Sequence, residues 1–162
     1  MQDSTIEVIE GSRPRFDRPV KILVAVAGPE QDINAALVKG ALAELEAAGA
    51  EVEEISLPRV GDVPQALALA ERMQDYDGYV VLGAVIDLPV LWSEVARALT
   101  GLGMSGGLNG NGLILAETPA AAMQLALPEG GNAGGEAAAS VLGLIGLARE
   151  WGGKSKGIGF RA

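Results

Sequence analysis

The sequence predicts an α/β protein: a three-layer α/β/α sandwich around a four-stranded parallel sheet of flavodoxin-like type, with a further strand in an N-terminal arm. Two observations predict this class. Short apolar runs alternate along the chain with longer segments that have helical spacing. Some of the runs are also as apolar as strands that are buried on both faces of a parallel sheet. The 162 residues are enough for one domain with a single continuous core.

Four segments are expected to form the core strands. Lys21–Ala27 (KILVAVA) and Gly78–Ile86 (GYVVLGAVI) are continuous apolar runs, which are typical of fully buried strands. Glu51–Leu57 alternates between charged and apolar residues, and residues 112–117 form a fourth, shorter strand. Because helical segments separate these strands, right-handed crossovers should bring all four into one parallel sheet.

Five helices are expected between and after the strands, over residues 32–48, 64–74, 91–102, 120–127 and 132 to about 151. Asp32 and Asn132 are suitable N-cap residues at two of the starts. Gly49 is suited to end the first helix, and Pro64 fits a first helical turn. These residues set the expected helix boundaries.

Composition divides the chain into three parts. Residues 1–19 are predicted to be an assembly arm, in which residues 6–10 alternate weakly as a strand and prolines keep residues 11–19 extended. We expect this arm to leave the domain before the core begins. Residues 20–151 form the domain, and residues 152–162, rich in Gly and Lys, are predicted to be a flexible tail.

The residue inventory excludes several kinds of chemistry. The sequence has no Cys and no His, which rules out disulfides, thiolate zinc sites, cysteine nucleophiles and imidazole proton transfer. With 12 basic residues against 21 acidic ones, the net charge is −9, so no nucleic-acid partner is expected. The basic cluster Arg13, Arg15, Arg18 and Lys21 is interpreted as a solvated arm rather than a binding patch.

No membrane association is expected either. Gly or charged residues interrupt the longest apolar runs before they could span a bilayer. The first residues, MQDST, lack the basic and apolar regions of a signal peptide. We therefore expect a cytoplasmic protein.

Two segments carry a resemblance to a known family. YDGYVVLGAVI (residues 76–86) is similar to the strand that reads YDxxxxLGxVIRG in lumazine synthases, and GNAGGEAA (residues 131–138) resembles their helix start GNKGxEAA. Residues 57–64 resemble the VPGAxExP turn, residues 111–115 the NGILT strand, and residues 8–11 the arm of shell-forming members. Together these matches extend over residues 6–151.

The resemblance implies an enzyme of riboflavin biosynthesis. The family condenses an amino-ribitylamino-pyrimidinedione with a four-carbon keto phosphate, and it needs neither a metal nor a cofactor because it mainly holds two reactants together and moves protons. Its sites lie between neighbouring subunits of a pentamer. The implied partners are therefore further copies of this chain and a small molecule.

At the positions that the resemblance assigns to the ring and its ribityl chain, the sequence departs from the pattern. Pro29 stands where the family has an aromatic residue that stacks on the pyrimidine, and a proline offers no π stacking. Val60, Gly61 and Asp62 stand in the turn that meets the ribityl chain. Asp62 could keep the acceptor role of the family's Glu, or it could simply cap the helix that starts at Pro64.

The phosphate-binding positions depart further. Val85 and Ile86 end the third strand as in the family, but Asp87 replaces the arginine that follows, and Pro89 removes a backbone donor. A carboxylate at this place should repel a phosphate dianion.

The positions for proton transfer and for two cations have changed as well. Trp92 stands where the family has its proton-transfer histidine, and an indole has no useful pKa. Trp92 could instead stack on a flavin-like ring, or it could belong to the core or an interface. Leu125 and Ala133 stand where the family has Arg and Lys, and Asn111 remains a ligand-binding candidate.

These departures favour a diverged, catalytically impaired member that forms a pentamer-based assembly, either with a lumazine- or flavin-like ligand or only as a container. We expect pentamers as the minimum unit and a closed shell of sixty subunits rather than a decamer, because the arm strand and the compact turn over residues 127–132 are both present. One alternative is an active synthase that works mainly by positioning, since the loss of a general acid or base costs only ~10²–10⁴-fold. Another is a different binding module on the same scaffold.

Overall fold

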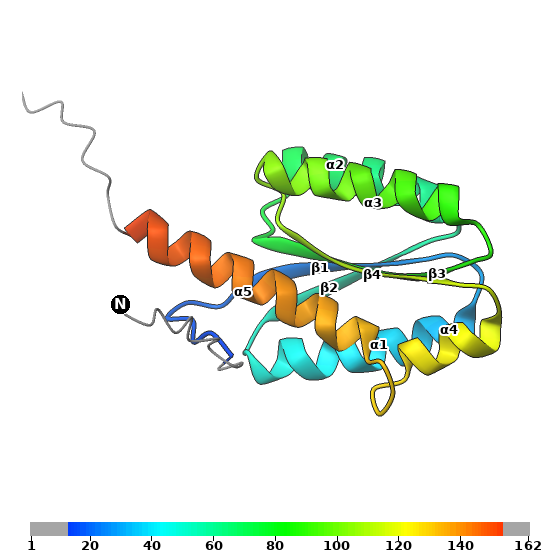
Figure 1. The fold of residues 1–162 in the computed structure, drawn as a ribbon. Helices are drawn as coiled ribbons and strands as arrows, with labels where there is room; N and C mark the ends of the chain where they lie inside the picture. The colour runs from blue at the N-terminus through cyan, green and yellow to red at the C-terminus, as the bar shows by residue number, and fades with distance from the viewer. Residues whose placement is uncertain (1–12, 154–162) are drawn as a thin grey trace, which may run out of the picture.

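The computed structural model describes residues 13–153, and its elements alternate between strands and helices (Figure 1). In chain order they are β1 Lys21–Ala27, α1 Gln31–Ala47, β2 Glu51–Leu57, the short 3₁₀ helix η1 Val60–Asp62, α2 Val63–Met73, β3 Gly78–Ile86, α3 Pro89–Met104, β4 Asn109–Ala116, α4 Pro119–Ala126 and α5 Ala133–Gly153. The strands form one four-stranded parallel sheet in the order β2-β1-β3-β4. The predicted sheet is confirmed, whereas the arm strand at residues 6–10 lies outside the described residues.

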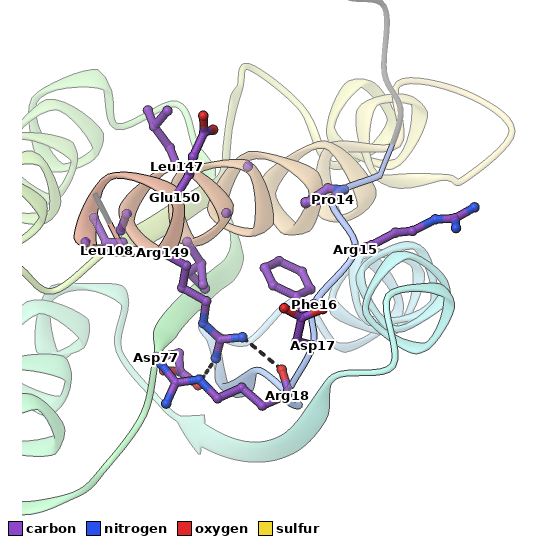
Figure 2. Close-up of a pocket in the computed structure, with 16 residues that line it drawn as sticks. Pro14, Arg15, Phe16, Asp17, Arg18, Asp77, Leu108, Leu147, Arg149 and Glu150 are labelled. Carbon is purple, nitrogen blue, oxygen red and sulfur yellow. Dashed lines mark hydrogen bonds and ion pairs between the residues drawn. The ribbon is translucent and has the colours of Figure 1, made fainter. Parts of the chain in front are cut away.

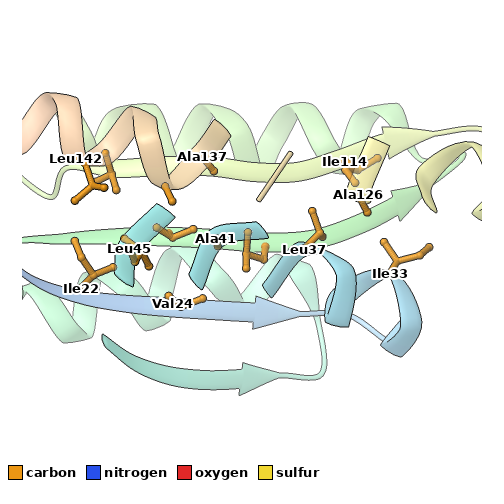
Figure 3. Packing of buried hydrophobic residues seen from close by; sticks show 14 of the residues in the cluster. Ile22, Val24, Ile33, Leu37, Ala41, Leu45, Ile114, Ala126, Ala137 and Leu142 are labelled. Carbon is orange, nitrogen blue, oxygen red and sulfur yellow. The ribbon is translucent and has the colours of Figure 1, made fainter. Parts of the chain in front are cut away.

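The sheet is covered on both faces, which confirms the three-layer sandwich (Figure 1). Ile22 and Val24 of β1 point into a core shared with α1, α4 and α5. Leu23 and Ala25 point into a second core shared with α2 and α3. Figure 3 shows the first core, in which side chains of α1, among them Leu37, pack over β1 and β3, and side chains of α5 pack over β3 and β4. The continuous apolar run of β1 is therefore explained by burial on two faces.

Several of the predicted boundaries differ from the structure by two or more residues. α3 starts at Pro89, where a proline fits the first turn, two residues before the expected position 91. β4 starts at Asn109 rather than 112, since Gly110 lets the strand pass close to α5: a Cβ there would lie 1.9 Å from the Ala137 carbonyl oxygen. α5 continues through Gly153, so the first two residues of the predicted tail are helical.

The two expected side-chain caps do not form. α1 starts at Gln31 with Glu30 at its N-cap position and no side-chain cap, so the prediction of Asp32 as the cap is wrong. Asp32 lies in the first turn instead, where its carboxylate still interacts favourably with the positive end of the helix dipole. Asn132 immediately precedes α5, and its carbonyl oxygen accepts from Glu136 N–H at 2.9 Å. Its buried side-chain oxygen, however, has no hydrogen-bond partner.

The described part of the predicted arm, residues 13–19, lies along α1 and α5 rather than pointing away from the domain (Figure 2). The Arg13 guanidinium pairs with the Glu44 carboxylate at 2.9 Å. Arg149 donates to the carbonyl oxygens of Arg18 at 2.8 Å and Pro19 at 3.3 Å, and its guanidinium lies over the Phe16 ring. Charged side chains therefore hold this segment on the domain.

Within residues 13–153, no helix combines the length and the apolar character needed to cross a bilayer. The same part of the chain holds no group of three or more His, Cys, Asp or Glu side chains placed to bind a metal ion.

Candidate functional site

A hollow of about 430 Å³ lies at the carboxyl ends of β1, β2 and β3. Carboxyl ends of parallel strands are the usual ligand site of open α/β sheets. Its walls come from three places: the turn after β1, the turn after β2, and the end of β3 with the start of α3. The lining residues are Gly28, Pro29, Glu30, Pro58, Arg59, Val60, Gly61, Ala84, Val85, Ile86, Leu88 and Leu91.

Strand register creates the space for this hollow. Ala27, the last residue of β1, pairs with Gly83 of β3. β3 then continues to Ile86 alongside β4, whose Ala116 is its last partner. The final residues of β3 therefore have no strand beside them on the β1 side. This leaves an open step at the edge of the sheet, where β1 ends before β3, and the side chains at the end of β3 line it.

The turn after β1 brings Pro29 to the rim of the step. Gly28 has φ +89, a left-handed conformation that favours glycine, and its N–H donates to the Leu57 carbonyl oxygen at 3.0 Å. A Cβ on Gly28 would lie 3.4 Å from Val60. The turns after β1 and β2 are thus joined by a backbone hydrogen bond and by close packing.

The opposite wall is the turn between β3 and α3. Asp87 has φ +54, and its N–H donates to the Ala116 carbonyl oxygen at 2.8 Å, so the chain turns sharply at this residue. Leu88, Val90 and Leu91 follow with exposed fractions of 55%, 75% and 38%. This rim is apolar and largely exposed, unlike an ordinary helix start.

The structure brings half of the predicted ligand-binding residues together. Pro29, Val60, Gly61, Val85 and Ile86 all line the hollow. Asp62 and Asp87 are not among the lining residues, although each is next to one in sequence. Asp62 precedes α2 at its N-cap position but makes no side-chain cap hydrogen bond.

The other candidates lie outside the hollow. The Trp92 indole N–H donates to the Leu113 carbonyl oxygen at 2.9 Å, and the half-buried ring packs against the second core. Asn111 is exposed on β4, where its side-chain oxygen accepts from Leu113 N–H at 2.9 Å. Leu125 is 44% exposed on α4, in the layer that covers the other face of the sheet.

Sequence reasoning missed the charged residues of the lining, Glu30 and Arg59. Within the described part of the chain, Arg59 is the one basic residue of the lining, and its Nε lies 3.7 Å from the Asp62 carboxylate. The sequence did carry one signal for Arg59: it replaces the glycine in the third position of the family turn VPGAxExP. A single exposed cation has no periodicity, so the pattern alone did not distinguish it from an ordinary surface residue.

A larger hollow of about 1250 Å³ lies at the other end of the sheet, between residues 14–18 and the last turns of α5 (Figure 2). Asp77 and Leu108, which precede β3 and β4, form part of its wall. It is therefore at the amino ends of the strands, where open α/β sheets do not usually bind ligands. We assign the smaller hollow as the candidate site.

The strongest pKa shift among the described residues also lies away from this site. Burial, followed by the hydrogen bond that the Tyr79 hydroxyl donates to Glu71 at 2.6 Å, raises the pKa of Tyr79. Tyr79 is at the amino end of β3, away from the hollow, and its hydroxyl is a hydrogen-bond donor to Glu71 of α2. The hollow itself has an apolar surface with few polar groups, which suits the binding of a ring more than proton transfer.

Comparisons with known proteins show the family to which the chain belongs. The family model described as 6,7-dimethyl-8-ribityllumazine synthase matches residues 19–149. Proteins of that name from Novosphingobium aromaticivorans and Jannaschia sp. are 40% and 39% identical to this chain. The first match covers 81% of this chain and 98% of the relative, and the second covers 91% and 86%. 6,7-dimethyl-8-ribityllumazine synthase 1 of Rhizobium meliloti is 35% identical, over 83% of this chain and 95% of its own length. The parallel sheet and the hollow at the carboxyl ends of its strands are compatible with these matches. The matches show that the chain belongs to the lumazine synthase family of riboflavin biosynthesis.

Proposed function

We propose that the chain is a 6,7-dimethyl-8-ribityllumazine synthase that works mainly by positioning its reactants. One observation carries the proposal: the residues that line the hollow include Pro29, Val60, Gly61, Val85 and Ile86, which stand at positions that the family resemblance assigns to its reactants. The similar proteins from two organisms carry the name of the enzyme. This supports the active alternative more than the impaired subunit that the sequence departures favour.

Positioning is the main catalytic contribution available to this site. Holding two reactants in a productive arrangement replaces a bimolecular encounter by an intramolecular step. The chain has no His, and Trp92 uses its indole N–H to bind a backbone carbonyl. We therefore expect turnover slower by ~10²–10⁴-fold than in a relative with a general acid or base.

The second candidate function is an assembly subunit without synthase activity. The specific observation in its favour is the charge pattern: Asp87 follows the end of β3, and Leu125 and Ala133 stand at the family's two cationic positions. Fewer cations and an added carboxylate weaken the binding of a phosphorylated reactant.

An assay with both reactants separates the two candidates. Lumazine formation is followed by absorbance, with the Novosphingobium enzyme as the reference and a reaction without enzyme as the background. Gly61→Trp should fill the hollow without a backbone clash, because nothing lies within 4 Å of a Cβ at this position. Gly143→Trp on α5, where a Cβ also meets nothing within 4 Å, is the matched control.

We expect product above background for the natural sequence and for Gly143→Trp, and none above background for Gly61→Trp. A background rate for the natural sequence would support the assembly subunit instead. A rate equal to that of the reference would contradict catalysis by positioning alone.

The chain is further proposed to act as a homo-oligomer built from pentamers. The site has an open, apolar rim at Leu88, Val90 and Leu91, and a second copy could cover this rim. Such a contact would remove exposed apolar surface from water and close the site at the same time.

A further inference from the structure

Arg59 has an unusual position at the mouth of the candidate site. Among the described residues that line the hollow it is the one basic residue, and its side chain is 79% exposed. Within residues 13–153, its single polar side-chain contact is the 3.7 Å ion pair from Nε to the Asp62 carboxylate. The terminal nitrogens of the guanidinium are therefore available to a ligand.

The backbone beneath this side chain is firmly placed. Arg59 is extended, with φ −125° and ψ 129°, immediately before η1. Its carbonyl oxygen accepts from Asp62 N–H at 3.1 Å, which closes the turn. Because the backbone is already fixed, binding a ligand costs only the conformational entropy of the arginine side chain.

The charges around the hollow make Arg59 the favoured place for an anion. Glu30 lines the same hollow, Asp62 pairs with Arg59, and Asp87 follows Ile86 at the end of β3. Glu30 and Asp87 disfavour a negative group near the turns after β1 and β3, whereas Asp62 lies in the turn after β2 and offsets part of the Arg59 charge. A negatively charged ligand group is thus directed toward the turn after β2, where the guanidinium can donate two parallel hydrogen bonds.

We propose that this site accepts a ring compound whose polyol tail ends in a phosphate, with the ring in the apolar hollow and the phosphate at Arg59. The ring and the ribityl tail rest on the proposed function. The phosphate is the new element: it makes Arg59 a specificity-determining residue that favours the phosphorylated form of such a compound over the unphosphorylated form.

Flavin mononucleotide and riboflavin are a matched pair of probes, because they differ only in the terminal phosphate. The dissociation constant of each is measured by quenching of flavin fluorescence, on the full chain, at low and at high salt. The variants are Arg59→Ala, Arg59→Lys, Asp62→Asn and the control Arg72→Ala. Arg72 is exposed on α2 and does not line the hollow, so its removal changes the net charge alone.

The natural sequence should bind flavin mononucleotide about tenfold more tightly than riboflavin at low salt, as expected for one good charge-assisted contact. Arg59→Ala should bind the two flavins equally, Arg59→Lys should retain part of the preference, and Asp62→Asn should increase it. Arg72→Ala should keep the natural preference. High salt should weaken the preference wherever it is present.

Equal affinity of the natural sequence for the two flavins would overturn the proposal, as would an equal loss of preference in Arg59→Ala and Arg72→Ala. Failure to bind either flavin would also overturn it. The synthase assay decides the proposed function separately: turnover without phosphate preference removes the role of Arg59 alone, and phosphate preference without turnover removes the catalytic function alone.

Discussion

At the scale of single residues, charged side chains determine how the segment before β1 lies on the domain. Arg13 makes two hydrogen bonds to Glu44 of α1, at 2.9 and 3.1 Å. Arg149 of α5 donates to two backbone carbonyls of the segment and lies 3.4 Å from the Asp77 carboxylate. Asp77 also accepts from Lys21 N–H at 2.8 Å. These contacts join the segment to two helices and to the start of the sheet.

The pair of Arg13 and Glu44 should contribute stability that depends on pH. The hydrogen bond from Arg13 holds the pKa of Glu44 below its ordinary value. A carboxyl whose pKa is lowered by folding stabilises the protein above its unfolded pKa, and this contribution is lost as the pH falls through the lowered pKa. Glu44→Gln should therefore destabilise the protein slightly at pH 7 and hardly at all in strong acid. Because half of the Arg13 side chain is exposed, the effect should also fall with salt.

Urea unfolding at neutral and acidic pH measures this difference. Glu46→Gln is the control, since Glu46 is exposed on the same helix. An equal destabilisation of Glu44→Gln at both pH values would mean that packing, not charge, is responsible.

At the scale of secondary-structure elements, glycines bring the helices of one layer into close contact. Gly134 lies at the start of α5, and a Cβ there would be 2.0 Å from the Leu37 carbonyl oxygen of α1. A backbone atom cannot move aside as a side chain would. Gly143, nine residues further along α5, would place a Cβ in open space. The helix contact therefore requires a glycine at position 134 but not at position 143.

Gly134→Ala and Gly143→Ala should change stability in opposite directions. Alanine is a better helix former than glycine by about 1 kcal/mol. At position 143 this gain should appear almost unopposed. At position 134 the contact with Leu37 should outweigh it, with a net loss of about 1–3 kcal/mol. Chemical denaturation of the two variants tests this, and a stabilised Gly134→Ala would show that α1 and α5 can separate at little cost.

At the scale of the whole molecule, the layer formed by α2 and α3 exposes large apolar side chains. Met73, Val90 and Met104 have exposed fractions of 72%, 75% and 85%. Within residues 13–153, β2 is an edge strand that pairs only with β1, and an unpaired edge is a liability unless a partner covers it. Both features are consistent with the proposal that further copies of the chain cover this side of the molecule.

Mass measurement of the native particle tests the assembly. We expect pentamers or multiples of pentamers, and Val90→Asp together with Met73→Asp should shift the population toward monomers because a buried carboxylate is costly. Deletion of residues 1–10 should leave pentamers and prevent any larger particle. A monomer of the natural sequence at micromolar concentration would contradict the assembly. Retention of a larger particle after the deletion would remove the role of the arm.

Much of the fold could be predicted from local patterns. β1 and β3 have the predicted bounds because a continuous apolar run of seven or nine residues is itself the condition for burial on both faces of a sheet. β2 has the predicted bounds too, and its alternation suits a strand with no fully buried residue. The turn residues of the candidate site, Pro29 and Val60, followed from a family pattern. These properties depend on neighbours in the sequence, and the sequence displays them directly.

The remaining features depend on distances between segments that are far apart in the chain. The early start of β4 at Asn109 has no local signal, because its cause is the close approach of Ala137 from α5 to Gly110. Trp92 finds its partner at the Leu113 carbonyl, and Arg59 becomes a site residue only where three strand ends meet. Side chains that act through long-range contacts have no periodicity of their own, and their roles appear only when packing brings the segments together.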